Sequence, residues 1–342
     1  MIFQNTIVRF LAFFIPVKDM RENFIKKCSR KTKYRKLRDD LQAVKRELKA
    51  LRGDIKGHID LRLNSYFNTF FDYKDIKYNN PDLRIIQNAR NIVLVKLKEI
   101  CNENHIKYWL DFGTLVGAAR HQGFVPWDDD IDIGMLREDY GRLEKIIGQY
   151  PMMNTRKTFF KNGTTFARVY QELNEFNIGF DIFIYDYINV ENYENTISVL
   201  NESKNKLLKD LKSLSYNSGG SISFDFYLEN KSTIDDIFDR YLTNCNVLRN
   251  NGSHVSNITN LWRPFYFYDK SSLFPLKNII FEGTEHTVPS NLEEFLRVEF
   301  KNYMLLPNDT GKITHGSFFS NDKMSILKQF IDYNSKKDIG GG

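Results

Sequence analysis

The segment from Pro126 to Gly134 holds four aspartates within five residues and continues into an apolar alternation typical of a β-strand. Side chains two positions apart on a strand share a face, so we expect Asp128, Asp130 and Asp132 to point the same way. Two like charges about 4 Å apart repel by roughly 4 kcal/mol at an effective dielectric of about 20, so a bound cation would stabilise the cluster. Carboxylate oxygens favour Mg²⁺ or Mn²⁺, which predicts a divalent-metal site that handles a phosphate. The alternative is a solvated acidic loop, which has no reason to alternate with isoleucines.

Asp181 is a third candidate ligand, because it interrupts a second apolar alternation that also predicts a strand. It completes a three-carboxylate cage with Asp130 and Asp132 if the two strands are neighbours. The alternative is an acid at the surface of an edge strand. The other two acids of the run would then hydrogen-bond the loop from outside the cage: Asp128 and Asp129.

A glycine–threonine pair between an expected strand and an expected short helix indicates an anion site. Gly113 lets the backbone approach a ligand closely, and Thr114 leads into a helix N-terminus with free N–H groups. Simple turn formation is the alternative. Arg120 and Arg168 are candidate phosphate contacts, because a guanidinium presents a planar fork of donors; ordinary ion pairs are the alternative.

The elements that position these residues mix helices and strands, which predicts an α+β or α/β domain. We expect helices over 83–100, 115–121 and 137–150 and through most of 191–250. Besides the acidic segment, strands are expected over 108–112, 158–160, 165–170 and 180–185.

Length, cysteine content and charge narrow the class of protein. At 342 residues the chain can form one large domain or two smaller ones. Its three cysteines show neither zinc spacing nor a disulfide framework, which favours a reducing cytoplasmic compartment. Residues 18–38 carry ten Lys and Arg against two acids, whereas the chain after residue 38 is mildly acidic. This distribution argues against a nucleic-acid-binding protein.

The N-terminus is expected to bind a membrane surface. Residues 7–17 are apolar except for Arg9, but they are too few to span about 30 Å of hydrocarbon as a helix. An apolar run followed by a basic run suits the interface of an anionic membrane, here the inner face of the cell membrane. The alternative is an apolar element docked on the protein itself.

A heptad pattern follows the basic segment and predicts a helix with a coiled-coil seam. The seam would pair two chains as a homodimer or lie on the chain's own domain. Its apolar residues recur at alternating steps of three and four: Tyr34, Leu37, Leu41, Val44, Leu48, Leu51 and Ile55.

The stretch from Tyr108 to Met135, YWLDFGTLVGAARHQGFVPWDDDIDIGM, resembles the LicD family, to which the fukutin-related proteins are similar. Shorter similarities extend the resemblance over roughly residues 85–316, with gaps. The resemblance implies a nucleotidyltransferase-like α+β fold and a phosphotransferase. Such an enzyme would move phosphocholine, ribitol phosphate or a similar group from a CDP-linked donor to a glycan hydroxyl, as in lipopolysaccharide or capsule biosynthesis.

The family pattern also implies roles for individual residues. It assigns the metal to Asp130, Asp132 and Asp181, the donor phosphate to the Gly113–Thr114 pair, and a C-terminal histidine to His315 as a weak candidate. Residues 191–270 match nothing in the family, which leaves the acceptor open. Two rivals stay open as well: a glycosyltransferase that holds a nucleotide sugar through an Asp-X-Asp motif, and a membrane-tethered scaffold without activity.

These inferences divide the chain into five expected segments. They are an apolar membrane segment (1–17), a basic heptad helix (18–64), a linker (65–82), a nucleotidyltransferase-like core (83–190) and a mainly helical part that completes the domain and the acceptor site (191–335).

Overall fold

The computed structural model describes residues 18–70, 80–160, 164–174, 176–214, 221–222, 224–305 and 319–339. The expected membrane segment (1–17), His315 and the side chains of Tyr34 and Leu37 lie outside this description. The chain divides into two compact units, one holding helix α2 (Lys18–Phe70) and the other holding the elements from Pro81 onwards.

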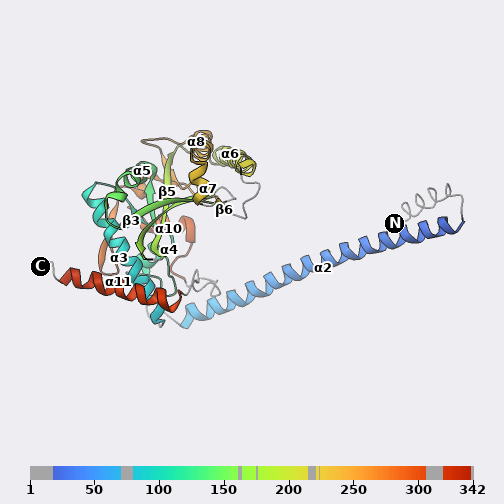
Figure 1. Ribbon diagram of the computed structural model, residues 1–342, viewed down its shortest axis with the longest axis horizontal. Coiled ribbons are helices and arrows are strands. Elements are labelled where there is room, and N and C mark those ends of the chain that lie inside the picture. Colours follow the sequence, from blue (N-terminus) through green and yellow to red (C-terminus); the bar gives the residue numbers. More distant parts are fainter. Residues whose placement is uncertain are drawn as a thin grey trace. The chain divides into compact units, whose positions relative to one another are not determined.

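Helix α2 is continuous over 53 residues (Figure 1). It passes through Gly53 and Gly57, each of which costs only about 1 kcal/mol relative to alanine. The expected linker therefore began too early, since residues 65–70 are still helical. No Gly or Pro in this stretch breaks the helix.

A mixed sheet forms the centre of the second unit and confirms the α+β class (Figure 1). Its order is β1-β2-β5-β4-β3-β6, and β7 pairs with the last residues of β5 on one side and with β8 on the other. The β2–β5 pair is parallel, and the neighbouring pairs are antiparallel. The strands are β1 (Trp109–Leu110), β2 (Asp132–Leu136), β3 (Met153–Phe160), β4 (Thr165–Leu173), β5 (Phe176–Ile188), β6 (Ser221–Ile222), β7 (His254–Ser256) and β8 (Tyr268–Asp269).

Helices bury one face of this sheet, and the strands alternate accordingly. In β4 the side chains of Ala167 and Val169 are fully buried, whereas Arg168 points to the opposite face. The apolar side of α3 joins the same core, and α3 also packs against α11. The helices are α3 (Pro81–Glu103), α4 (Phe112–His121), α5 (Arg137–Ile146), α6 (Tyr193–Leu214), α7 (Phe224–Glu229), α8 (Lys231–Asn244), α9 (Lys270–Leu273), α10 (Leu292–Phe300) and α11 (Asn321–Ile339).

Two expected boundaries near the motif are wrong. The strand expected over 108–112 is limited to Trp109–Leu110, because the Asp111 carboxylate accepts the backbone N–H of Phe112 and caps α4 there. Gly113 and Thr114 therefore lie in the first turn of a helix, not in a turn before it. The acidic segment is a loop until Asp132, where β2 begins.

The part after residue 190 is less helical than expected. Helices α6 and α8 lie where the sequence pattern predicts helices, and they pack together around a second apolar core. A hairpin of β9 (Lys277–Phe281) and β10 (Thr284–Val288) follows, in addition to β7 and β8. Its two-residue loop, Glu282-Gly283, has positive φ at both positions, as a type I′ turn requires.

Candidate metal centre

Three aspartates from two neighbouring strands meet at one point. Asp132 at the start of β2 is the register partner of Asp181 in β5, so the two side chains share a face. Asp130 lies just before β2, and carboxylate oxygens of all three residues come within 4.8 Å of one another. The structure thus brings together the three acids that the sequence analysis placed in one cage.

Burial and mutual repulsion raise the pKa values of this cluster. The pKa of Asp132 lies well above its ordinary range, first because of burial and then because of the charges of Asp130 and Asp181. Burial also raises the pKa of Asp181 to about 6, although Arg168 opposes the shift. Carboxylates that are costly to ionise, with oxygens only a few ångströms apart, form a donor set that fits a hard divalent cation.

Arg168 adjoins the cluster from β4. It is the register partner of Asp181, and its Nε donates a 2.8 Å hydrogen bond to Asp181 Oδ1. Arg156 of β3 is in turn the register partner of Arg168, and its guanidinium lies 5.6 Å from the ring centroid of Tyr170. The four register partners form one row of side chains across the sheet, in which two acids are followed by two bases: Asp132, Asp181, Arg168 and Arg156. Of the two predicted phosphate-binding arginines, Arg168 lies beside the acids.

The first turn of α4 supports the acidic loop. The Thr114 hydroxyl accepts a 2.8 Å hydrogen bond from the backbone N–H of Asp132. A Cβ at Gly113 would lie 2.8 Å from Asp128 Oδ2, so only glycine lets that carboxylate approach the helix. Both residues thus position the loop, and their predicted contact with a donor phosphate stays a prediction.

Two residues of α3, which the sequence analysis missed, hold the same loop. Gln87 Nε2 donates a 2.7 Å hydrogen bond to the backbone oxygen of Asp128. Arg90 Nη1 lies 3.5 Å from Asp129 Oδ2 and 3.6 Å from Asp130 Oδ1. Asp129 thus turns toward α3 rather than into the cage. The sequence did contain a signal for this contact, because Gln87 and Arg90 are polar residues three positions apart on the apolar side of the helix.

Arg120 serves a different contact. It is buried, and its Nη1 donates to the backbone oxygens of Tyr303 and Leu305 at 3.1 and 3.3 Å. Its guanidinium also lies 5.7 Å from the ring centroid of Trp127. These contacts tie α4 to the chain after α10, so Arg120 does not enter the function proposed below.

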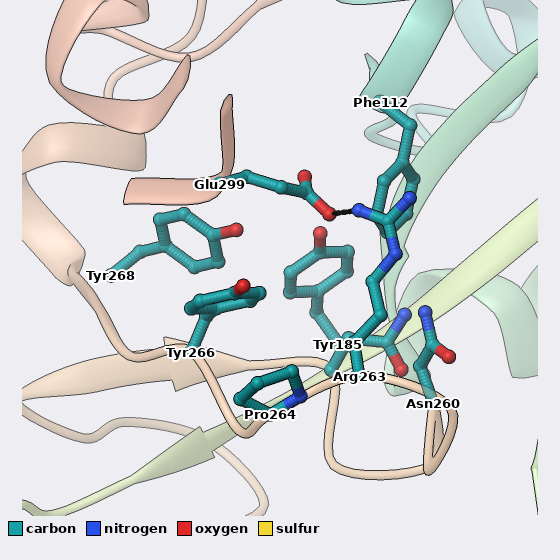
Figure 2. A pocket seen from close by; sticks show the side chains of 9 residues that line it. Phe112, Tyr185, Asn260, Arg263, Pro264, Tyr266, Tyr268 and Glu299 are labelled. Atoms are coloured by element: carbon teal, nitrogen blue, oxygen red, sulfur yellow. Dashed lines mark hydrogen bonds and ion pairs between the residues drawn. The ribbon is translucent and has the colours of Figure 1, made fainter. Parts of the chain in front are cut away.

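An aromatic pocket lies beside α4 and is drawn in Figure 2. Arg263 crosses it, forms an ion pair with Glu299 and lies 4.8 Å from the ring centroid of Phe112. Burial raises the pKa of Glu299 to about 8, and Arg263 opposes this shift. Tyr185 also lines the pocket, and its hydroxyl donates a 2.8 Å hydrogen bond to Asp111 Oδ2. The pocket thus adjoins the cap of the helix that supports the acids.

Comparison with known proteins finds similarity in the same region. Residues 105–218 match the model of the LicD/FKTN/FKRP nucleotidyltransferase domain. The chain is 54% identical over 44 residues to the lipopolysaccharide cholinephosphotransferase LicD of Haemophilus influenzae, covering 13% of this chain and 17% of that protein. It is 49% identical over 43 residues to the human ribitol 5-phosphate transferase FKRP, covering 13% of this chain and 9% of that one. It is also 49% identical over 55 residues to the uncharacterized protein RP689 of Rickettsia prowazekii, covering 16% and 21%. The matched segments span less than a quarter of each of these relatives.

Proposed function

We propose that this protein transfers a phospho-alcohol from a CDP-linked donor to a glycan hydroxyl and releases CMP, because residues 105–218 match the model of a LicD-type nucleotidyltransferase domain. The observation that carries the proposal is the convergence of Asp130, Asp132 and Asp181 within the matched region. Phosphocholine and ribitol phosphate are the proposed cargoes, by analogy with the two named relatives. The product would belong to lipopolysaccharide or capsule biosynthesis.

The side chains of the site would share the work of a phosphoryl-type transfer. Mg²⁺ or Mn²⁺ held by the three aspartates would neutralise charge on the donor diphosphate. Arg168 favours the ionised form of Asp181, and its partly exposed guanidinium would also bind a phosphate oxygen. As the acceptor oxygen bonds to phosphorus and the bond to CMP breaks, the hydroxyl proton passes to a nearby carboxylate, for which Asp181 is our choice.

The released nucleotide separates this function from its main rival. With a panel of CDP-alcohols and a glycan acceptor, we expect CMP to appear in step with a mass increase of the glycan by one phospho-alcohol. Release of a nucleoside diphosphate from a nucleotide sugar would instead establish the glycosyltransferase. Absence of either product over the whole panel would favour the scaffold, which the complete set of acids argues against.

We further propose that the chain works as a peripheral protein at the inner face of the cell membrane. Over the residues that the structure describes, no helix is both long and apolar enough to cross a bilayer. The support for attachment is the basic N-terminal part of α2, where each basic residue near an anionic surface contributes about 1 kcal/mol.

Removal of residues 1–36 should release the protein from anionic vesicles while turnover on a water-soluble acceptor persists. Vesicle sedimentation measures the first effect, and CMP release measures the second. A matched control keeps the full length and replaces Lys26 and Lys27 with glutamine, which should weaken binding only in part. If the truncated protein still sediments with vesicles, the tether lies elsewhere.

A further inference from the structure

The long helix α2 carries an apolar seam on its surface. Five residues define this seam, and their exposed fractions run from 49% to 60%: Leu41, Val44, Leu48, Leu51 and Ile55. They occupy the a and d positions of a heptad, with a at 41, 48 and 55 and d at 44 and 51. Before Leu41 the a and d positions hold Tyr34 and Leu37, whose side chains lie outside the description, and Arg62 stands at the a position after Ile55.

Charges flank the seam with opposite signs on its two sides. The positions just before each a residue are acidic: Asp40, Glu47 and Asp54. The positions just after the two d residues are basic: Lys45 and Arg52. In coiled-coil terms, the g positions are negative and the e positions are positive.

This asymmetry distinguishes the two ways in which two copies can pair. In a parallel, in-register pair, each g residue faces the e residue five positions later on the partner. Asp40 then meets Lys45, and Glu47 meets Arg52, and symmetry repeats both pairs. In an antiparallel pair, g faces g and e faces e, so acids would meet acids and bases would meet bases.

Glu47 and Arg52 have no oppositely charged residue three or four positions away on their own helix. Residues four positions from Glu47 are Ala43 and Leu51, and those four positions from Arg52 are Leu48 and Lys56. Neither residue forms an ion pair within the part of the chain that the structure describes. Ordinary solvated helices place opposite charges three or four residues apart. Glu47 and Arg52 are not placed in that way, whereas Asp40 follows Lys36 by four residues.

We propose that α2 joins two copies of this chain as a parallel, in-register coiled coil through the five seam residues. This inference deepens the homodimer expected from the heptads by fixing its orientation, its register and its ion pairs. It does not depend on the catalytic proposal, since association is measured without substrate. A parallel pair also brings two basic N-terminal ends of α2 together, which would raise avidity for an anionic surface.

Charge reversal tests the orientation in the full-length protein. Glu47→Lys turns two attractive pairs into two repulsive ones in the parallel dimer, so its dissociation constant should rise about tenfold. Adding Arg52→Glu to this variant restores opposite charges, and the double variant should return to within about threefold of the original value. Sedimentation velocity over a concentration series measures all three proteins. An antiparallel pair predicts no weakening, because position 47 would face a g position of the partner, where Asp40, Asp54 or a second copy of the same lysine stands.

Disulfide trapping tests the register. In a Cys28→Ser background, Val44→Cys should form a disulfide-linked dimer on mild oxidation, because parallel in-register d positions face each other. Gln42→Cys, on the outer side of the helix, is the matched control and should not be trapped. The other cysteines, Cys101 and Cys245, are buried. A monomeric mass at all concentrations, a trimer, or equal trapping of the two variants would overturn the proposal.

Discussion

Replacement of Asp132 by asparagine is expected to lower turnover by at least about 10³-fold, because the cation loses a central ligand. The same change should leave the melting temperature unchanged or raise it. In the absence of metal the folded protein holds Asp132 among Asp130, Asp181 and Asp128, and a neutral amide removes that repulsion. Asp130→Asn and Asp181→Asn should lower turnover in the same way. CMP release and thermal unfolding in EDTA measure the two effects.

The stability gain should depend on pH. The folded-state pKa values of Asp132 and Asp181 are raised, so the folded protein binds these protons more tightly than the unfolded chain does. The tighter proton binding by Asp181 contributes its full share to the free energy of unfolding at a pH below the ordinary carboxyl pKa. This contribution is lost as the pH rises to about 6 and beyond. The variants should therefore gain more over the original protein at pH 8 than at pH 4.

A matched control separates the cluster from acidity in general. Asp236 is an exposed aspartate of α8, and Asp236→Asn should alter neither turnover nor the melting temperature. Substantial turnover in any of the three cluster variants would contradict the metal centre. So would a large drop in the melting temperature of Asp132→Asn, because Asp132 would then serve stability and not a cation.

Periodicity explains why the core of this site was predictable. An alternating strand fixes which side chains share a face, so Asp132 and Asp181 had to point away from the isoleucines beside them. Their proximity depended on β2 and β5 being neighbours, which periodicity cannot establish. The structure shows that β2 and β5 are parallel neighbours and that their register pairs residue 132 with residue 181.

Residues that support the site were harder to predict because their roles arise from tertiary contacts. Arg90 lies on a helix whose pattern indicates only an amphipathic element, and nothing in the sequence connects it to Asp129. Gly113 and Thr114 were assigned to a turn because the capping role of Asp111 was not recognised. The β9–β10 hairpin was missed although its Glu282-Gly283 turn follows a known rule.

Arg168→Met should lower kcat/KM about 10- to 100-fold at pH 7, the range expected when a charged hydrogen bond is lost. The loss should be smaller at pH 9. Arg168 lowers the pKa of Asp181 against the effect of burial, so its removal moves that pKa above about 6 and leaves fewer ionised carboxylates at pH 7. The acid limb of the pH–rate profile, measured at limiting Mg²⁺, should therefore shift upward.

Arg156→Met distinguishes this effect from a general loss of positive charge. Arg156 is the next residue of the same row, and its guanidinium lies over the ring of Tyr170. Its loss should weaken donor binding at most, and the acid limb should stay in place. If Arg168→Met instead lowers kcat/KM equally at every pH, the arginine contacts substrate without tuning Asp181. The link between the ion pair and the charge state of the metal centre would then be wrong, even with the three acids correctly placed.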